Sequence, residues 1–446
     1  MYRGRRRRGG RLRVALLIAA ALLIVGAGAF FAVRFAFQTA EPQPPSPPQG
    51  PSAQEILERA DRLALQYDYD GAIALVRGYE GYAEDEQLAD AVSRYEAEKA
   101  TLVPADISEI PHVFFHSLIN DPGKVFDGDY KQDDYNQVMT TVSEFRKIMQ
   151  QMYDRGYVLV SVHDMAQMVR GEDGSYKMTA GKIMLPPGKK PFVLSQDDVS
   201  YYEYMMDDGY PNRLVVDEEG RVVNEIDRPD GTVERGAFDL VPLLDAFVEE
   251  HPDFSYRGRK GIIALTGYNG ILGYRTSDRV YGPGGTGDWE NANLEADKAK
   301  AKAVADAMRA NGWEFASHSW GHINYGSAKD EGFRRDADLW LKEVSPLIGE
   351  TDVIIFPFGS DVGDWHPYTG ERYQYLKNQG FRYFCNVDGS KYAWVQLTGD
   401  YLRQGRLNLD GYRMYQDLAN GKTKCAPFFD VASVFDPVRP LPVPDM

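Results

Sequence analysis

The sequence predicts a parallel α/β fold, a distorted (β/α) barrel of about seven strands. From residue 104 onward, short apolar runs alternate with longer segments of helical periodicity, which is typical of parallel β/α architecture. Seven apolar runs suit a closed barrel better than a flat sheet, so we expect residues 104–446 to form one barrel domain. The expected strands are 110–117, 157–162, 191–198, 261–268, 313–317, 352–359 and 382–387.

One segment interrupts this alternation of strands and helices. Residues 212–236 alternate apolar and polar positions around a Glu-Gly and an Asp-Gly pair, which predicts a β-hairpin inserted after the third barrel strand. Two interpretations stay open: the insertion shapes a substrate groove, or it is solvent-exposed decoration. The expected helices are 134–155, 237–250, 291–311 and 331–347.

The N-terminal residues predict a membrane anchor. Residues 1–13 carry seven arginines and no acid, and residues 14–33 are an uncharged apolar run that spans about 30 Å as a helix. We therefore expect a transmembrane helix within 14–37, with 1–13 as a cytoplasmic tail and the rest of the chain outside the cell. The alternative is a cleaved signal peptide, but its apolar region is usually only about 7–15 residues long.

A spacer and a small helical unit are expected to separate this anchor from the barrel. Residues 38–52 are rich in proline and predict an extended, semi-rigid linker. Residues 53–103 then show helical periodicity and predict a stalk of two or three helices, with packing or spacing as its expected role.

The charge of the chain argues against nucleic acid as a partner. The formal net charge is −16, although the N-terminal tail is strongly basic. Without the seven arginines of that tail, 43 basic residues face 66 acidic ones. Because nucleic-acid binding depends on neutralising phosphates, an acidic body of this kind does not favour it.

Two polar motifs follow predicted strands and could share a metal ion. Asp197 and Asp198 come directly after an apolar strand, and His318 and His322 follow another strand at i and i+4. On a helical turn, that spacing places both imidazoles on one face. Each motif alone is also common as turn or surface residues, but both lie where barrel enzymes build their sites.

These motifs predict a catalytic metal centre. One carboxylate and two imidazoles make a three-ligand site with an open position for water, which is the arrangement of catalytic zinc sites. In this interpretation Asp198, His318 and His322 bind the metal, and Asp197 is left free to accept a proton.

The same residues resemble the motifs of the polysaccharide deacetylase family, the group with NodB homology known as carbohydrate esterase family 4. Its Thr-Phe-Asp-Asp-Gly motif is matched by residues 195–199, and its His-Ser/Thr-x-x-His motif by residues 318–322. Residues 356–359, Phe-Pro-Phe-Gly, are similar to the third motif, and the resemblance covers roughly 105–420. It implies a distorted (β/α) barrel, a metal that is usually zinc, and hydrolysis of the acetamide of an N-acetylated sugar.

The sequence departs from that family in two places. The third motif normally begins with an arginine that pairs with the base, and Ile355 stands there. A late histidine normally acts as the acid, but no histidine follows His366. Asp410, close to Arg406 in sequence, is the positional substitute for this acid, although it is also typical of a turn before glycine. His366 is another candidate acid. His116, at the end of the first strand, resembles a Tyr-His that many members carry, and a structural histidine is the alternative interpretation.

The sequence thus predicts a membrane-anchored, metal-dependent hydrolase that removes acetyl groups from a cell-wall or extracellular polysaccharide. A catalytically impaired glycan-binding protein on the same barrel, or a hydrolase of another amide bond, remain alternatives. Cys385 and Cys425 leave a disulfide open. The candidate substrate-binding residues are Pro357, Phe358, Gly359, Trp320 and Tyr201, with Tyr202 and Tyr204 as further aromatic walls.

Overall fold

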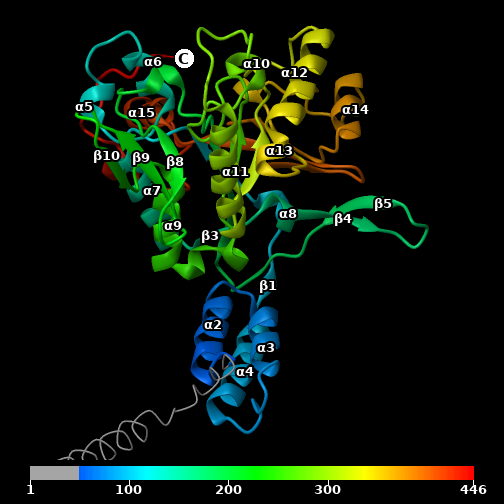
Figure 1. Ribbon diagram of the computed structural model, residues 1–446. Coiled ribbons are helices and arrows are strands. Elements are labelled where there is room, and N and C mark those ends of the chain that lie inside the picture. The colour runs from blue at the N-terminus through cyan, green and yellow to red at the C-terminus, as the bar shows by residue number, and fades with distance from the viewer. Residues whose placement is uncertain (1–49, 446) are drawn as a thin grey trace, which may run out of the picture. The chain divides into compact units, whose positions relative to one another are not determined.

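The computed structural model describes residues 50–445 (Figure 1). The predicted cytoplasmic tail, the transmembrane helix of 14–37 and most of the 38–52 linker lie outside these residues. Within the part that is described, no helix combines the length and the apolar character that crossing a bilayer requires.

Three helices form the predicted stalk: α2 (Ala53–Leu65), α3 (Tyr69–Arg77) and α4 (Glu86–Lys99). The N-cap side chains of Asp68 and Asp85 accept backbone N–H groups of α3 and α4, which satisfies donors that a helix start leaves free. The stalk contacts the barrel domain through the Arg62–Glu249 ion pair and through Tyr67, which stacks on Tyr256.

Seven parallel strands close into a ring, which confirms the predicted barrel. Each strand pairs in parallel with both neighbours, and β7 completes the ring by pairing with β11 on one side and β2 on the other. In order around the ring, the strands are β7 (Lys190–Asp197), β11 (Ile262–Leu265), β12 (Glu314–Ser317), β13 (Val353–Ile355), β14 (Tyr383–Val387), β16 (Leu402–Asn408) and β2 (His112–Phe115).

The ring differs from the predicted set of strands at two positions. The predicted strand at 157–162 is β3 (Tyr157–Leu159), which pairs only with the first residues of β7 and stays outside the ring. Its place is taken by β16, which the sequence did not predict. All seven residues of β16 are buried, yet four of them are Arg403, Gln404, Arg406 and Asn408, so the strand lacks an apolar run.

Helices lie outside the ring of strands (Figure 1). The predicted helix at 134–155 is divided in two, because Met139 and Thr141 have extended backbone and Thr141 starts the second helix with a capping box to Glu144. The longer helices are α6 (Gln132–Val138), α7 (Val142–Asp154), α9 (Leu240–Glu250), α11 (Leu294–Ala310), α12 (Asp330–Glu343), α14 (Glu371–Asn378) and α15 (Gly411–Asn420). The short ones are α5 (Pro122–Val125), α8 (Val162–Met165), α10 (Asp278–Tyr281), α13 (Ser345–Ile348) and α16 (Val431–Val434).

The insertion after β7 is a three-stranded antiparallel sheet, one strand more than the predicted hairpin. Its strands are β8 (Arg213–Val216), β9 (Val222–Asp227) and β10 (Val233–Gly236), and the sheet packs against α9 and α11. Gly220 and Gly231 occupy the two turns with φ of 81° and 83°, a conformation that glycine adopts without strain. Both turns are those that the sequence predicted.

The remaining elements are small. Residues 166–180 form a separate two-stranded ribbon, visible in Figure 1, and both cysteines are free and buried. The strands not yet named are β1 (Val103–Pro104), β4 (Ala166–Arg170), β5 (Tyr176–Ala180), β6 (Met184–Leu185) and β15 (Trp394–Leu397). The 3-10 turns are η1 (Ile107–Glu109), η2 (Glu203–Met205), η3 (Pro252–Phe254), η4 (Tyr256–Gly258) and η5 (Pro357–Gly359).

Candidate metal centre and active site

The candidate site lies at the carboxyl ends of the barrel strands. Asp197 is the last residue of β7, and His318 comes directly after β12. His116 follows β2, which pairs with β7, and Asp410 follows β16, which pairs with β2. Because parallel strands end at the same edge, residues far apart in the sequence meet at one rim.

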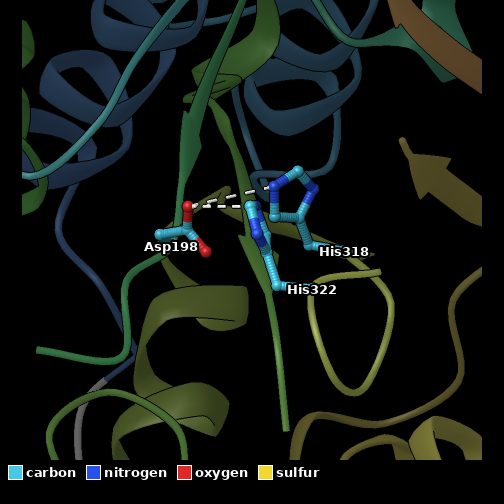
Figure 2. Close-up of side chains that lie close together, drawn as sticks. All are labelled: Asp198, His318 and His322. Atoms are coloured by element: carbon cyan, nitrogen blue, oxygen red, sulfur yellow. Dashed lines mark ion pairs between the residues drawn. The ribbon is translucent and has the colours of Figure 1, made fainter. Parts of the chain in front are cut away.

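Asp198, His318 and His322 come together as the sequence predicted for a metal site (Figure 2). One ligand atom from each lies within 4.8 Å of the others, and within residues 50–445 this is the one such cluster of three or more. Asp198 Oδ2 is 3.6 Å from His322 Nε2 and 4.0 Å from His318 Nε2. Two imidazole nitrogens and one carboxylate oxygen are a donor set that suits Zn²⁺ and leaves a coordination position open.

The protonation of these side chains also suits a metal. His318 Nδ1 lies 2.8 Å from the carbonyl oxygen of Ile355, so this nitrogen carries the proton and Nε2 keeps its lone pair. Burial lowers the pKa of His318, which favours the neutral imidazole that a metal requires. Burial alone would raise the pKa of Asp198, but the nearby His322 and the hydrogen bond from Tyr202 lower it, so that carboxylate is ionised.

The local backbone differs from the helical turn that the spacing of the histidines suggested. Residues 318–322 form an irregular loop, and the two imidazoles meet because the chain turns sharply between them. Asp198, Ser319 and His322 have φ of 61°, 61° and 52°, values that are uncommon for residues other than glycine. Backbone strain of this kind is typical of functional sites, where surrounding contacts hold it in place.

Asp197 forms a buried ion pair with Arg406 of β16. Arg406 Nη1 is 2.7 Å from Asp197 Oδ1, and both side chains are almost fully buried. Burial alone would raise the pKa of Asp197, but the charge of the Arg406 guanidinium and its hydrogen bond hold the pKa below its usual value. Asp197 is therefore an ionised carboxylate beside the candidate metal ligands, 4.0 Å from His318 Nε2.

Arg406 is the residue that the sequence interpretation missed. With Ile355 in the third motif, the base was expected to lack its arginine, yet a different strand supplies one. Arg406 also donates to Ser195 Oγ at 3.1 Å and lies over the ring of Phe114. The signal available in the sequence was the closeness of Arg406 to Asp410, but nothing local indicated that it faces Asp197.

His116 lies at the same rim as the two aspartates and Asp410. It follows β2, which pairs with β7 on one side and β16 on the other, so its loop starts between the strand ends that carry Asp197 and Asp410. His116 Nδ1 is 3.2 Å from the carbonyl oxygen of Val138, which leaves Nε2 as the nitrogen available to a ligand. His116 therefore occupies the part of the rim where the sequence placed Asp410 as the acid.

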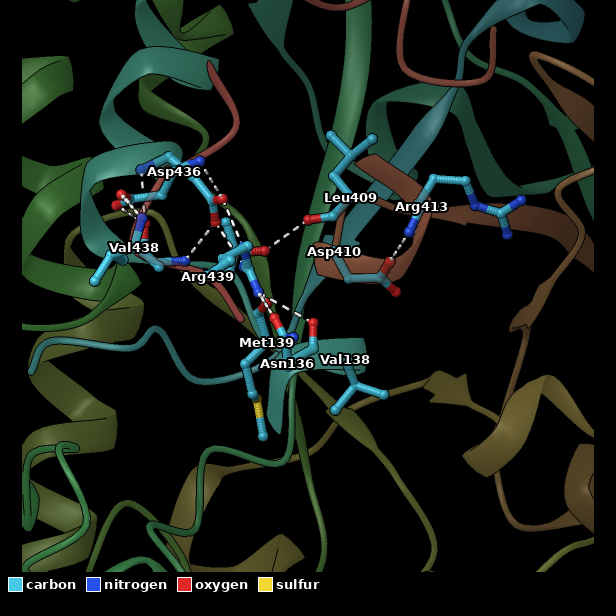
Figure 3. A network of polar contacts seen from close by, with 12 residues as sticks. Asn136, Val138, Met139, Leu409, Asp410, Arg413, Asp436, Val438 and Arg439 are labelled. Atoms are coloured by element: carbon cyan, nitrogen blue, oxygen red, sulfur yellow. Dashed lines mark hydrogen bonds and ion pairs between the residues drawn. The ribbon is translucent and has the colours of Figure 1, made fainter. Parts of the chain in front are cut away.

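Asp410 itself is engaged by its neighbours (Figure 3). Its carboxylate caps α15 by accepting the backbone N–H of Arg413 at 2.7 Å, and it also accepts a hydrogen bond from Asn408. Burial raises its pKa. Asp410 is thus the turn residue before Gly411 that its sequence context suggested, within electrostatic reach of His116.

The C-terminal segment holds the turn that carries Val138 (Figure 3). Arg439 donates to the carbonyl oxygens of Asn136 at 3.0 Å and Met139 at 2.7 Å, and forms a fully buried ion pair with Glu144. These contacts fix the backbone on both sides of Val138, whose carbonyl oxygen accepts the hydrogen bond from His116.

The remaining predicted residues differ in their exposure. Phe358 is exposed and lies edge-on to His322, with ring centroids 4.5 Å apart, whereas Pro357 of the same turn is buried. Gly359 has φ of 65°, and a side chain there would collide with Val387. His366 is exposed and pairs with Asp364.

Two predicted substrate-binding aromatics face the protein interior. Tyr201 is fully buried and donates its hydroxyl to Asp239, so it has no surface to offer a ligand. The indole N–H of Trp320 donates to Glu343 on α12. Tyr202 is instead the tyrosine that contacts a candidate metal ligand, because its hydroxyl donates to Asp198 Oδ1 at 2.5 Å.

The chain is similar to solved structures of low sequence identity. No family model and no curated protein matches the chain. The deacetylase PplD of Streptococcus pyogenes, solved in complex with acetate, is similar with a TM-score of 0.33 and 12% identity over 70% of this chain and 94% of that one. BC0361, a polysaccharide deacetylase from Bacillus cereus, has a TM-score of 0.31 and 11% identity over 69% and 65% of the two chains.

Both of these similar structures are deacetylases by description.

Proposed function

We propose that this protein is a metal-dependent N-deacetylase of the polysaccharide deacetylase family, acting on N-acetylated sugars of a glycan. The single observation that supports this most is the meeting of two pairs of side chains at one rim. Asp198, His318 and His322 offer three ligand atoms to one ion, and the ionised carboxylate of Asp197 lies next to them.

Asp198, His318 and His322 are the residues that would hold the metal, for which zinc is the expectation. When bound, a divalent cation supplies Lewis-acid polarisation of the amide carbonyl and makes water more acidic. The neutral His318, with its Nε2 lone pair free, and the ionised Asp198 are ready to bind without a change of protonation.

Asp197 acts as the general base in this proposal. Its carboxylate accepts a proton from the attacking water, whose oxygen forms the new bond to the carbonyl carbon of the acetamide. Arg406 keeps that carboxylate ionised and fixes its orientation through the 2.7 Å ion pair. The tuning of the base, which the altered third motif had put in doubt, is thus available from β16.

His116 is the proposed proton donor to the leaving amine. The C–N bond breaks as the sugar nitrogen accepts a proton, so that acetate and the free amine are the products. The contact of Nδ1 with Val138 O leaves Nε2 for the proton transfer. Asp410 caps α15 in this proposal, instead of acting as the acid itself.

The proposed location is the outer face of a cell membrane, and a cell-wall or extracellular polysaccharide is the proposed substrate. Both rest on the apolar run of residues 14–33 and its arginine-rich flank. An impaired glycan-binding protein is the weaker candidate, because a binder has little need of a buried base paired with its own arginine.

Acetate release from N-acetylglucosamine oligomers tests the proposal. Purified full-length protein, loaded with Zn²⁺, is expected to release acetate, and removal of the metal with a chelator is expected to abolish the release. Asp197→Asn and His318→Ala should both be inactive, while only His318→Ala should also lose bound metal. Equal activity in all three proteins would refute the proposal, and metal binding without turnover would support the glycan-binding alternative.

A further inference from the structure

A polar pocket lies between the inserted sheet and α11. It encloses about 740 Å³, which is enough for a sugar-sized ligand. The inserted sheet forms one wall through Arg213 and Val215, and α11 forms another. The turn η2, five residues after Asp198, contributes Glu203, and Trp289 completes the lining from the loop before α11.

Trp289 is a fixed aromatic surface in this pocket. Its side chain is 45% exposed, although its indole is held on two sides. The indole N–H donates to Glu203 Oε1 at 2.8 Å, and the ring packs on Tyr281 with centroids 5.0 Å apart. Glu203 in turn accepts from the hydroxyl of Tyr281 and from Asn269. An exposed indole held this firmly loses little freedom when a ligand packs on it.

Aromatic rings connect the pocket with the candidate metal ligands. Tyr204 neighbours Glu203 on η2, is half-exposed, and stacks on Tyr202 with centroids 5.2 Å apart and planes 10° from parallel. Tyr202 in turn donates its hydroxyl to Asp198. The turn η2 therefore carries two residues with different contacts. Tyr204 stacks on the tyrosine that contacts the metal ligands, and Glu203 holds Trp289 in the pocket.

The charges in the pocket are balanced, and half of the charged side chains pair with one another. Four basic and four acidic side chains contribute to its lining. Arg213 bonds to both Glu225 and Asp227, and Arg235 bonds to the other oxygen of Glu225. Arg275 donates to three main-chain carbonyl oxygens. The pocket therefore presents hydrogen-bonding groups and an aromatic face, without an excess of either charge.

We propose that this pocket binds further, uncharged sugar residues of the substrate chain, with Trp289 as the ring on which one of them packs. Sugar rings combine an apolar C–H face with hydroxyl groups, which matches an exposed indole among polar side chains. The inference rests on the proposed deacetylase function and names its substrate class: a neutral oligosaccharide or polysaccharide, not a single sugar.

Chain-length dependence tests the role of Trp289. In Trp289→Ala, kcat/KM for the N-acetylglucosamine tetramer should fall about tenfold, as expected for truncating a packed aromatic contact. The value for monomeric N-acetylglucosamine should stay within about twofold, because the monomer does not reach the pocket. Trp289→Phe should recover most of the loss. Tyr176→Ala, which truncates an exposed aromatic residue on β5, is the matched control and should leave both substrates unaffected.

Binding to the inactive Asp197→Asn protein separates this inference from the proposed function. Calorimetry is expected to show tetramer binding that is weakened about tenfold by the additional Trp289→Ala change. If no acetylated sugar is turned over but this Trp289-dependent binding is found, the pocket is supported and the deacetylase function is not. Equal losses on monomer and tetramer, or no loss on either, overturn the pocket assignment while deacetylation stands.

The charge of the ligand is tested with two further probes. Affinity for the neutral tetramer should change little between low and high salt, because no charge on the ligand is screened. An oligogalacturonate of the same length, which is anionic, should bind more weakly. Equal or tighter binding of the oligogalacturonate would overturn the proposed neutral class.

Discussion

At the scale of single residues, the Asp197–Arg406 pair is the feature on which the proposed chemistry depends most. A buried carboxylate is costly unless a partner compensates its charge, and the arginine does so from a different strand. The pair thus couples the stability of the barrel to the state of the proposed base.

Replacing Arg406 with methionine should expose this coupling. Arg406→Met leaves Asp197 buried without its partner, which should lower the free energy of unfolding by about 3–5 kcal/mol. Urea unfolding of the full-length protein measures this, and acetate release should fall in parallel.

The double variant Arg406→Met with Asp197→Asn supplies the control. Removing the charge as well should recover much of the lost stability without recovering activity, because the base is now absent. If the single variant Arg406→Met were as stable and as active as the wild type, the assigned ion pair between Asp197 and Arg406 would be contradicted.

The proton donor can be identified by comparing His116 with Asp410. His116→Gln should lower kcat about 10²–10⁴-fold, the usual contribution of a general acid, with metal content unchanged. Asp410→Asn should have a smaller effect on kcat, because asparagine still caps α15 as well as aspartate does. Steady-state kinetics with metal analysis distinguishes the two. A larger loss in Asp410→Asn would restore Asp410 as the acid.

Among the site residues, the sequence could predict only those whose position follows from their neighbours in the chain. Asp198, His318 and His322 each follow an apolar strand, so their place on the rim could be predicted from a few neighbouring residues. Arg406 could not, because its partner lies 209 positions away and β16 is lined with polar side chains. The orientation of Tyr201 into the interior likewise depends on Asp239, which no local pattern connects to it.

At the scale of elements, the inserted sheet is part of the core on one face. Leu214 and Val222 belong to the main apolar cluster, and Asn224 accepts the backbone N–H groups of Phe238 and Asp239. Its outer strand β10 is mostly exposed. Strict alternation predicted the strands, but which face is buried depends on α9 and α11, which the local pattern does not contain.

Two substitutions on β8 compare the effect of truncating a buried side chain with that of truncating an exposed one. Leu214 is fully buried, so Leu214→Ala should lower the free energy of unfolding by about 2–5 kcal/mol. Val216, two residues along the same strand, is 36% exposed, and Val216→Ala should change it by less than about 0.5 kcal/mol. Urea unfolding measures both. If both substitutions have similarly small effects on the free energy of unfolding, the inserted sheet lies on the barrel without contributing to its core.

At the scale of the whole molecule, one end of the barrel carries the candidate site and the other carries a cluster of ion pairs. The carboxyl ends of the strands carry the strained loops and the candidate metal ligands. The opposite end carries an ionic cluster in which His163 of α8 lies 3.1 Å from Glu314 at the start of β12 and 2.8 Å from Asp352, next to β13. This cluster connects three segments that are far apart in the sequence.

The cluster at His163 should make stability depend on pH. Burial would lower the pKa of His163, but hydrogen bonds to Asp352 and Glu314 raise it to about 10, against about 6.5 in the unfolded chain. The protonated form is therefore favoured by folding. Its contribution is fully present below the unfolded pKa and is lost as pH rises through the folded one.

Comparing wild type with His163→Asn over that range isolates the effect. The difference in unfolding free energy between the two proteins should be largest near pH 6 and should shrink toward pH 10, since asparagine does not titrate. Groups elsewhere titrate alike in both proteins and cancel in the difference. Urea unfolding at a series of pH values gives the difference directly. A difference that stays constant would mean that His163 is neutral in the folded barrel and that Glu314 and Asp352 are held apart by other contacts.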